Sequence, residues 1–229
     1  MSKGKLELIA MASTILVAIA IVPACGGRKA GQAEVPEWNP VFGKIMTRWA
    51  SEVRPETVHR EYPRPQMERA EWLNLNGLWE YAIRPAGEPE PEAFDGHILV
   101  PFPAESALSG VRKPVGKENR LWYRRTFRIP KTWKKKRVLI NFEAVDWETR
   151  VLVNGEEAGS HKGGYDPFFF DITDHLKRRG DQEIVLSVWD PVNEGTQPRG
   201  KQVGNPRGIW YTSVTGIWAT VWLEPVPET

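Results

Sequence analysis

The sequence is poor in the residues that build disulfides and metal sites. Cys25 is the only cysteine among 229 residues, so an internal disulfide is excluded. The four histidines form no cluster with metal-site spacing, and we expect neither a metal nor another cofactor. An excess of one charge is also missing, because 31 basic residues nearly balance 29 acidic ones. The one dense basic run, Lys134 to Arg137, adjoins a predicted strand, which indicates a solvated strand end and no nucleic-acid partner.

The N-terminus has the pattern of an export signal. Lys3 and Lys5 precede an apolar run from Leu8 to Val22, which is shorter than the ~20 residues of a membrane-spanning helix. The run ends in VPAC and is followed by two glycines, as in a bacterial lipobox. Residues 1–25 are therefore predicted to be a signal peptide with Cys25 as the lipidation site. Ordinary cleavage or an uncleaved anchor is the alternative. Each interpretation predicts an exported bacterial protein, either a membrane-anchored lipoprotein or a periplasmic protein.

Residues 26–68 are predicted to be a loop-like lead-in segment. Prolines interrupt any long helix there, at Pro36, Pro40, Pro55, Pro63 and Pro65. A short helix is possible around Val41 to Val53.

Residues 69–227 have the pattern of an all-β domain. Short segments rich in β-branched and aromatic residues are separated by Gly, Pro, Asn and Asp, and no long amphipathic helix intervenes. The predicted strands are residues 76–83, 120–129, 137–142, 149–153, 167–172, 183–189 and 216–224. This order is typical of an antiparallel β-sandwich. Most of the 11 tryptophans are expected in its core, although exposed rings can stack on sugars.

The segment VNGEEAGSHKGGYDPFFFDIT, residues 153–173, contains two predicted turns. Asn154-Gly155 tolerates positive φ, which predicts a tight hairpin with a return strand. The paired glycines that follow permit a second close turn before the next strand. Thr173 or Asp174 is then predicted to cap one helical turn.

Several of these motifs together resemble one known domain. VNGEEAGSHKGGYDPFFFDIT, VLSVWDP and GIWYTSVTGIWATVWLEPVP are similar to parts of the N-terminal sugar-binding domain of glycoside hydrolase family 2. The upstream runs EYPRPQMERAEWLNLNGLWEYAI and LWYRRTFRIP resemble its opening strands. The resemblance covers roughly residues 46–227 and implies a jelly-roll β-sandwich, similar to galactose-binding modules. Because the family includes β-galactosidases, β-glucuronidases and β-mannosidases, it also implies a carbohydrate partner, a β-glycoside.

The resemblance further implies domains beyond the sandwich. In family 2 enzymes an immunoglobulin-like domain and a TIM barrel follow, and the barrel carries an acid/base glutamate and a nucleophilic glutamate. Retaining hydrolysis needs two carboxyl groups ~5–5.5 Å apart, and a barrel needs ~250 residues. This sequence has no βα-repeating region, so we expect it to lack the catalytic pair. The immunoglobulin-like and barrel domains are expected partners.

Two residues invite a catalytic interpretation that their context does not favour. The family's acid/base glutamate follows an asparagine, as Glu194 follows Asn193 here. This dipeptide lies in the loop WDPVNEGTQPRGKQ, whereas the family's pair ends a barrel strand, and no catalytic role is expected for Glu194. His161 is expected to be a hydrogen-bonding loop residue.

The same loop carries the candidate sugar-binding residues. Asp190, in the WDP motif, looks equivalent to a sugar-contacting aspartate of β-galactosidases, and a carboxylate can accept hydrogen bonds from two sugar hydroxyls. The alternative is an aspartate that closes the loop before Pro191. Trp210 and Tyr211 lie where β-glucuronidase-like members place a substrate-facing residue, with core packing as the alternative. The candidate sugar-binding set is Asp190, Gln197, Arg199, Lys201, Gln202, Trp210 and Tyr211.

Two functions of different classes follow from the sequence. The chain is either the sugar-binding domain of an exported family 2 β-glycosidase, present without its catalytic barrel, or a stand-alone lipoprotein that binds glycans without hydrolysing them. The first predicts an apolar surface that faces further domains. The second predicts a closed polar surface with an exposed aromatic platform.

The lipobox interpretation predicts that Cys25→Ser leaves the protein exported but releases it from the membrane. The thiol is the acylation site, and stable anchoring needs more than one acyl chain. Fractionation of cells that express the wild type and the variant measures the distribution. Unchanged membrane association of the variant would favour an uncleaved anchor.

Overall fold

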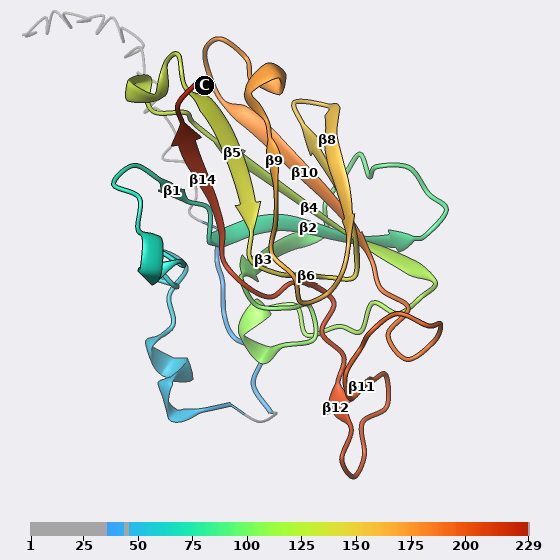
Figure 1. Cartoon of the computed structure of the whole chain (residues 1–229). Helices are drawn as coiled ribbons and strands as arrows, with labels where there is room; N and C mark the ends of the chain where they lie inside the picture. The colour runs from blue at the N-terminus through green and yellow to red at the C-terminus, as the bar shows by residue number, and fades with distance from the viewer. Residues whose placement is uncertain (1–35, 44–45, 229) are drawn as a thin grey trace, which may run out of the picture. The chain divides into compact units, whose positions relative to one another are not determined.

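Two antiparallel β-sheets face each other in the structure, a computed structural model that describes residues 36–43 and 46–228 (Figure 1). The predicted signal peptide and Cys25 lie outside the described residues. One sheet has four strands in the order β1-β14-β5-β9, and the other has six in the order β3-β2-β4-β10-β7-β8. The four-stranded sheet contains β1 (Leu73–Asn74), β5 (Arg137–Phe142), β9 (Phe168–Asp171) and β14 (Val221–Val226). The six-stranded sheet contains β2 (Gly77–Pro85), β3 (Gly96–Val100), β4 (Asn119–Phe127), β7 (Glu148–Val153), β8 (Glu156–Lys162) and β10 (Gln182–Trp189).

Short elements complete the described part of the chain. Two small ladders pair β6 (Val145–Asp146) with β13 (Gly216–Ile217) and β11 (Gln202–Val203) with β12 (Tyr211–Thr212). The 3-10 helices are Arg48–Glu52, Pro65–Met67, Ala107–Ser109, Lys131–Trp133 and Thr173–His175. The prediction of an antiparallel jelly-roll β-sandwich is confirmed.

Alternation along the strands explains how the core forms. In β7, Thr149, Val151 and Val153 are buried while the residues between them face outward. The inward-facing residues of both sheets form one apolar cluster, whose largest members include Trp79, Tyr123 and Phe142. Most of the hydrophobic stabilisation of the domain therefore lies between the two sheets.

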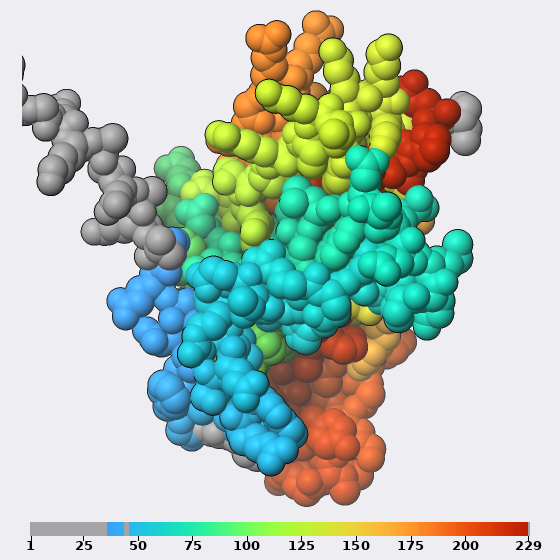
Figure 2. Space-filling model, turned by 90° about the vertical axis from the view of Figure 1, so that its left-hand side faces the viewer, coloured from blue at the N-terminus to red at the C-terminus, as the bar shows by residue number. Residues whose placement is uncertain are grey.

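The described residues of the lead-in, 36–43 and 46–68, belong to the same compact unit as the sandwich, and part of them packs on the four-stranded sheet (Figure 2). Glu224 of β14 is 1% exposed on this outer face. Its carboxylate accepts hydrogen bonds from the Tyr62 hydroxyl at 2.6 Å and the Trp222 indole at 2.5 Å. Arg69 forms an ion pair with it at 2.6 Å. Tyr62 of the lead-in and Arg69, directly after the lead-in, thus supply two of the three partners of a buried charge.

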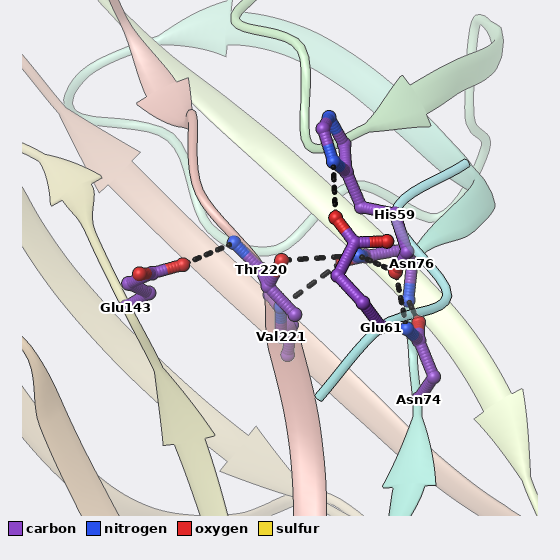
Figure 3. A network of polar contacts seen from close by, with 7 residues as sticks. All are labelled: His59, Glu61, Asn74, Asn76, Glu143, Thr220 and Val221. Carbon is purple, nitrogen blue, oxygen red and sulfur yellow. Dashed lines mark hydrogen bonds and ion pairs between the residues drawn. The ribbon is translucent and has the colours of Figure 1, made fainter. Parts of the chain in front are cut away.

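An asparagine network fixes the start of β14 beside the lead-in (Figure 3). The Asn76 side chain accepts a hydrogen bond from the Val221 N–H at 3.0 Å and donates one to the Thr220 hydroxyl at 3.3 Å. Asn74 and Asn76 both donate to the His59 carbonyl, at 2.6 and 3.1 Å. These bonds satisfy backbone groups where β1 ends and β14 begins.

Three local predictions need correction. The strand predicted over residues 216–224 is broken into β13 and β14. The helix around Val41 to Val53 shrinks to the 3-10 helix Arg48–Glu52. Neither Thr173 nor Asp174 caps the turn Thr173–His175: the Thr173 hydroxyl donates to Asp171 Oδ1 and accepts from the Val138 N–H, while Asp171 Oδ1 also accepts from the Thr173 N–H at 3.0 Å. The Asn154-Gly155 turn is confirmed, with φ of +53° and +86°.

Gly216 provides a test of close packing inside the sandwich. It has φ +94°, and a Cβ atom there would lie 2.0 Å from the Tyr123 hydroxyl. Gly180 has a similar φ of +86° with nothing within 4 Å. We expect Gly180→Ala to lower the free energy of unfolding by about 1 kcal/mol and Gly216→Ala by about 3 kcal/mol or more, measured by chemical denaturation. Equal losses would contradict this packing.

Candidate functional site

One end of the sandwich gathers three carboxyl groups from distant parts of the chain. Asp146 lies in β6, Asp190 follows β10, and Glu105 lies between β3 and β4. Asp146 and Asp190 are 3% and 2% exposed, and Glu105 is half-buried. Among the described residues, no lysine or arginine forms an ion pair with any of the three. Their oxygens therefore depend on neutral donors.

Those donors come from the segment after β10, residues 190–215, which we call the loop arm. The Thr215 hydroxyl donates to Asp190 Oδ2 at 3.0 Å, and the Thr215 N–H donates to Glu105 Oε2 at 2.9 Å. Gln202 Nε2 donates to Asp146 Oδ2 at 2.9 Å, and its Oε1 accepts from the Val214 N–H at 2.6 Å. The arm is thereby held against the carboxyl cluster.

Burial shapes the ionisation of this cluster. Loss of solvation raises the pKa of Glu105 to about 7 and the pKa of Asp146 to about 7, and the nearby Asp190 carboxyl adds to both shifts. Burial also raises the pKa of Asp190, against the hydrogen bonds from the Val192 N–H and the Thr215 hydroxyl. The cluster therefore takes up protons close to neutral pH, where ordinary carboxyl groups are ionised.

The structure divides the predicted sugar-binding residues into two groups. Asp190 and Gln202 are buried within the network. Gln197 is half-buried, and its side chain donates to the Val192 carbonyl at 3.0 Å. Asp190 Oδ1 also accepts from the Val192 N–H at 2.7 Å. These are the contacts of the loop-closing alternative, and a sugar contact by Asp190 stays a prediction.

The remaining four predicted residues lie together on the solvent side of the arm. Trp210 and Tyr211 are 41% and 63% exposed. The Arg199 guanidinium lies 6.0 Å from the centre of the Trp210 ring, and Lys201 Nζ lies 6.0 Å from that of Tyr211. The parallel ladder β11–β12 pairs Gln202 and Val203 with Tyr211 and Thr212 and so holds the second half of the arm together. We call Arg199, Lys201, Trp210 and Tyr211 the arm surface.

Two exposed aromatic side chains lie next to residues that contact the carboxyl cluster. Tyr165 and Trp218 pack edge to face with ring centres 6.0 Å apart. The Tyr165 hydroxyl accepts a hydrogen bond from Gln202 Nε2 at 3.1 Å, and the Trp218 indole donates to the Gly164 carbonyl at 2.8 Å. Gly164 is required here, since a Cβ atom would lie 2.5 Å from the Asp146 carboxyl.

Other candidates take different positions. Glu194 is exposed and pairs with Lys117. His161 was predicted in a loop, but it lies in strand β8, where it stacks on Phe168 with ring centres 4.1 Å apart. Within the described ranges, no group of three His, Cys, Asp or Glu residues is placed to hold a metal ion. Nor does this part of the chain contain a helix long and apolar enough to cross a membrane.

Sequence reasoning missed Glu105, Asp146 and Thr215. Glu105 and Asp146 lie in segments without a recognisable motif, and Thr215 lies in a quoted motif that does not indicate its carboxyl partners. Only the pairing of β6 with β13 brings Asp146 and Thr215 into the same region. Tyr165 stood within a quoted turn motif, but nothing in that motif indicated its contact with Gln202.

The raised pKa of Glu105 makes stability depend on pH. The folded state keeps a proton up to pH about 7, whereas the carboxyl ordinarily loses it near 4.5, so this contribution is present at low pH and lost as the pH rises. We expect stability to fall between pH 5 and 8, by roughly 3 kcal/mol at most from this group. Glu105→Gln should flatten the profile, measured by chemical denaturation across that range. Glu194→Gln, at an exposed carboxyl group, is the control, and an unchanged slope in Glu105→Gln would refute the assignment.

Comparison with known proteins identifies the domain. The chain matches the family described as glycosyl hydrolases family 2, sugar binding domain, over residues 73–224. It is 37% identical over 109 residues to a beta-galactosidase of Thermoanaerobacter pseudethanolicus, covering 47% of this chain and 14% of that protein. A putative beta-glucuronidase of Formosa agariphila is 33% identical over 158 residues, covering 68% of this chain and 18% of that protein.

A solved structure shares the fold. The beta-glucuronidase of Lactobacillus rhamnosus superposes with a TM-score of 0.57 at 25% identity, over 71% of this chain and 30% of that chain. The chain thus spans only a small part of its relatives, 10–24% of the first curated ones. Because the family match extends over most of the described sandwich, the chain belongs to glycosyl hydrolase family 2 and contains that family's sugar-binding domain.

Proposed function

We propose that the chain serves an exported family 2 β-glycosidase as its sugar-binding domain and that the arm surface contacts the β-glycoside. The observation that carries the proposal is the family match over residues 73–224 together with two exposed rings beside two cations on the arm. We assign the hydrolytic step to no residue of this chain.

The chemistry of the arm surface suits a sugar. The faces of Trp210 and Tyr211 can pack on the apolar face of a pyranose ring, while Arg199 and Lys201 can donate hydrogen bonds to its hydroxyl groups. Both cations also complement a uronic acid carboxylate. Because relatives are named both beta-galactosidase and beta-glucuronidase, the two sugar classes need a direct comparison.

Exposed apolar residues support the interpretation as part of a larger enzyme. In the described residues, the large exposed hydrophobic side chains include Phe42, Trp49 and Met67 on the lead-in. Their side chains are available for contact with further domains. The N-terminal pattern supports export, and we propose attachment to the membrane through Cys25.

The proposal predicts weak but selective binding of methyl β-glucuronide or methyl β-galactoside by the full chain. A single domain holds only part of a subsite, so the dissociation constant should be about millimolar. Trp210→Ala and Tyr211→Ala should each weaken binding about tenfold, because stacking on the sugar face is lost, without a change in melting temperature. Titration followed by NMR measures the affinity.

A matched control is Trp49→Ala, which removes a 55% exposed ring from the lead-in and should leave the affinity unchanged. Asp190→Ala separates the two roles of that residue. A lower melting temperature with unchanged affinity means that Asp190 only closes its loop. Absence of any effect of Trp210→Ala and Tyr211→Ala on binding would reject the arm surface as the sugar contact.

A further inference from the structure

The outer face of the six-stranded sheet contains a trough that runs across its strands. Residues directly opposite in antiparallel strands share a face, and the ladder places Trp122, Ser187, Arg150 and Ser160 in one row from β4 through β10 and β7 to β8. The two short serine side chains lie on either side of Arg150 in this row and leave space above the sheet at these two positions. The sheet thereby provides a rigid floor (Figure 1).

Longer side chains form a bank on one side of this row. The next row towards the loop arm contains Trp189, Glu148 and Lys162. Glu148 accepts from Arg120 and from Lys162, at 3.0 Å each, and Arg120 also donates to the Ser187 hydroxyl at 3.1 Å. These contacts fix the bank in one arrangement.

The opposite bank is formed in the same way. The row on that side contains Val185, Leu152 and Glu157. Arg150 reaches to it and pairs with Glu157 at 2.7 Å. The segment from Glu88 to Glu90, between β2 and β3, closes the end near Trp122. The resulting groove has a volume of about 470 Å³, within the range of about 300–1,000 Å³ typical of ligand sites.

The charges of the groove indicate the class of ligand. Three cations line it, Arg120, Arg150 and Lys162, together with four acids, Glu88, Glu90, Glu148 and Glu157. The four acids would repel a polyanion. A protein interface usually has an apolar centre, and the charged groove offers no matching apolar surface. The large exposed hydrophobic side chains of the described residues all lie outside it. A neutral chain rich in hydroxyl groups matches alternating fixed donors and acceptors on a rigid floor.

We propose that this groove is a second carbohydrate site, which binds a neutral β-linked oligosaccharide across strands β4, β10, β7 and β8. It is separate from the arm surface, shares no residue with it and does not depend on the proposed function of the arm. Arg150 and Glu157 from one bank, with Arg120 and Glu148 from the other, hydrogen-bond the sugar hydroxyls.

Titration of the full chain with cellotetraose, laminaritetraose and xylotetraose, followed by NMR, tests the proposal. At least one of them should bind and shift the indole N–H signal of Trp122. Arg150→Ala should weaken this binding about tenfold, because a charged hydrogen-bonding group is removed. Ser160→Tyr should also weaken it by filling the trough at an exposed position.

Arg128→Ala is the matched control, since Arg128 is also an exposed arginine paired with a carboxylate, Asp181, but lies outside the groove. It should bind like the wild type, and so should Trp210→Ala, which disables the arm surface alone. Melting temperatures show that each variant is folded. The proposal is overturned if no tetrasaccharide binds at about 20 mM. It is also overturned if binding is lost in Trp210→Ala and kept in both Arg150→Ala and Ser160→Tyr.

Discussion

The arrangement of the candidate site depends on burying three carboxyl groups without a cationic partner. Water is excluded from Asp146 and Asp190, so each needs donors from the protein or a proton of its own. The donors are Gln202, Thr215 and backbone N–H groups of the loop arm, which must therefore fold back onto the sandwich. The close fit leaves no room for a side chain at Gly164, beside the Asp146 carboxyl. The hydrogen bonds that hold the arm against the buried carboxyl groups thus also determine where its exposed rings, Trp210 and Tyr211, are placed.

On the outer face of the four-stranded sheet, by contrast, a buried carboxylate has a cationic partner. Glu224 is as deeply buried as Asp190, yet Arg69 of the segment just before β1 neutralises it. Removing Arg69 would leave the Glu224 carboxylate buried without a charged partner, which is unfavourable. Because the Tyr62 hydroxyl also donates to Glu224, the lead-in contributes to the folded domain as well, although its sequence contains no strand pattern. Glu224 is thus paired with a cation. The other three carboxyl groups have no cationic partner, and because burial raises the pKa of each, their protonation depends on pH.

Much of the sandwich follows from local patterns, and the rest depends on contacts between distant segments. Alternation and β-branched residues predict β2, β4, β5, β7, β9 and β10 within a few residues, and Asn154-Gly155 predicts its hairpin. β3 (Gly96–Val100) was missed, although Asp95-Gly96 and Pro101 flank it with turn signals, because it contributes only three consecutive apolar residues. Trp210 and Tyr211 could be proposed from their neighbours in sequence. Glu105 and Asp146 could not, because their shared environment arises only when β6 meets β13 and the arm closes over both.

Strand β10 connects the two surfaces proposed to bind carbohydrate. Ser187 lies on the floor of the groove, and Asp190, three residues further along the strand direction, anchors the arm, which corresponds to about 10 Å at the usual strand rise. Ser187 receives its hydrogen bond from Arg120 on the outer face, whereas Asp190 receives its bonds from the arm. No hydrogen bond or ion pair described here joins the two sets of residues directly. The side chains of the two surfaces therefore have separate hydrogen-bond partners. A substitution on one surface can change the ligand it binds without altering the other, and strand β10 keeps the distance between the two surfaces constant.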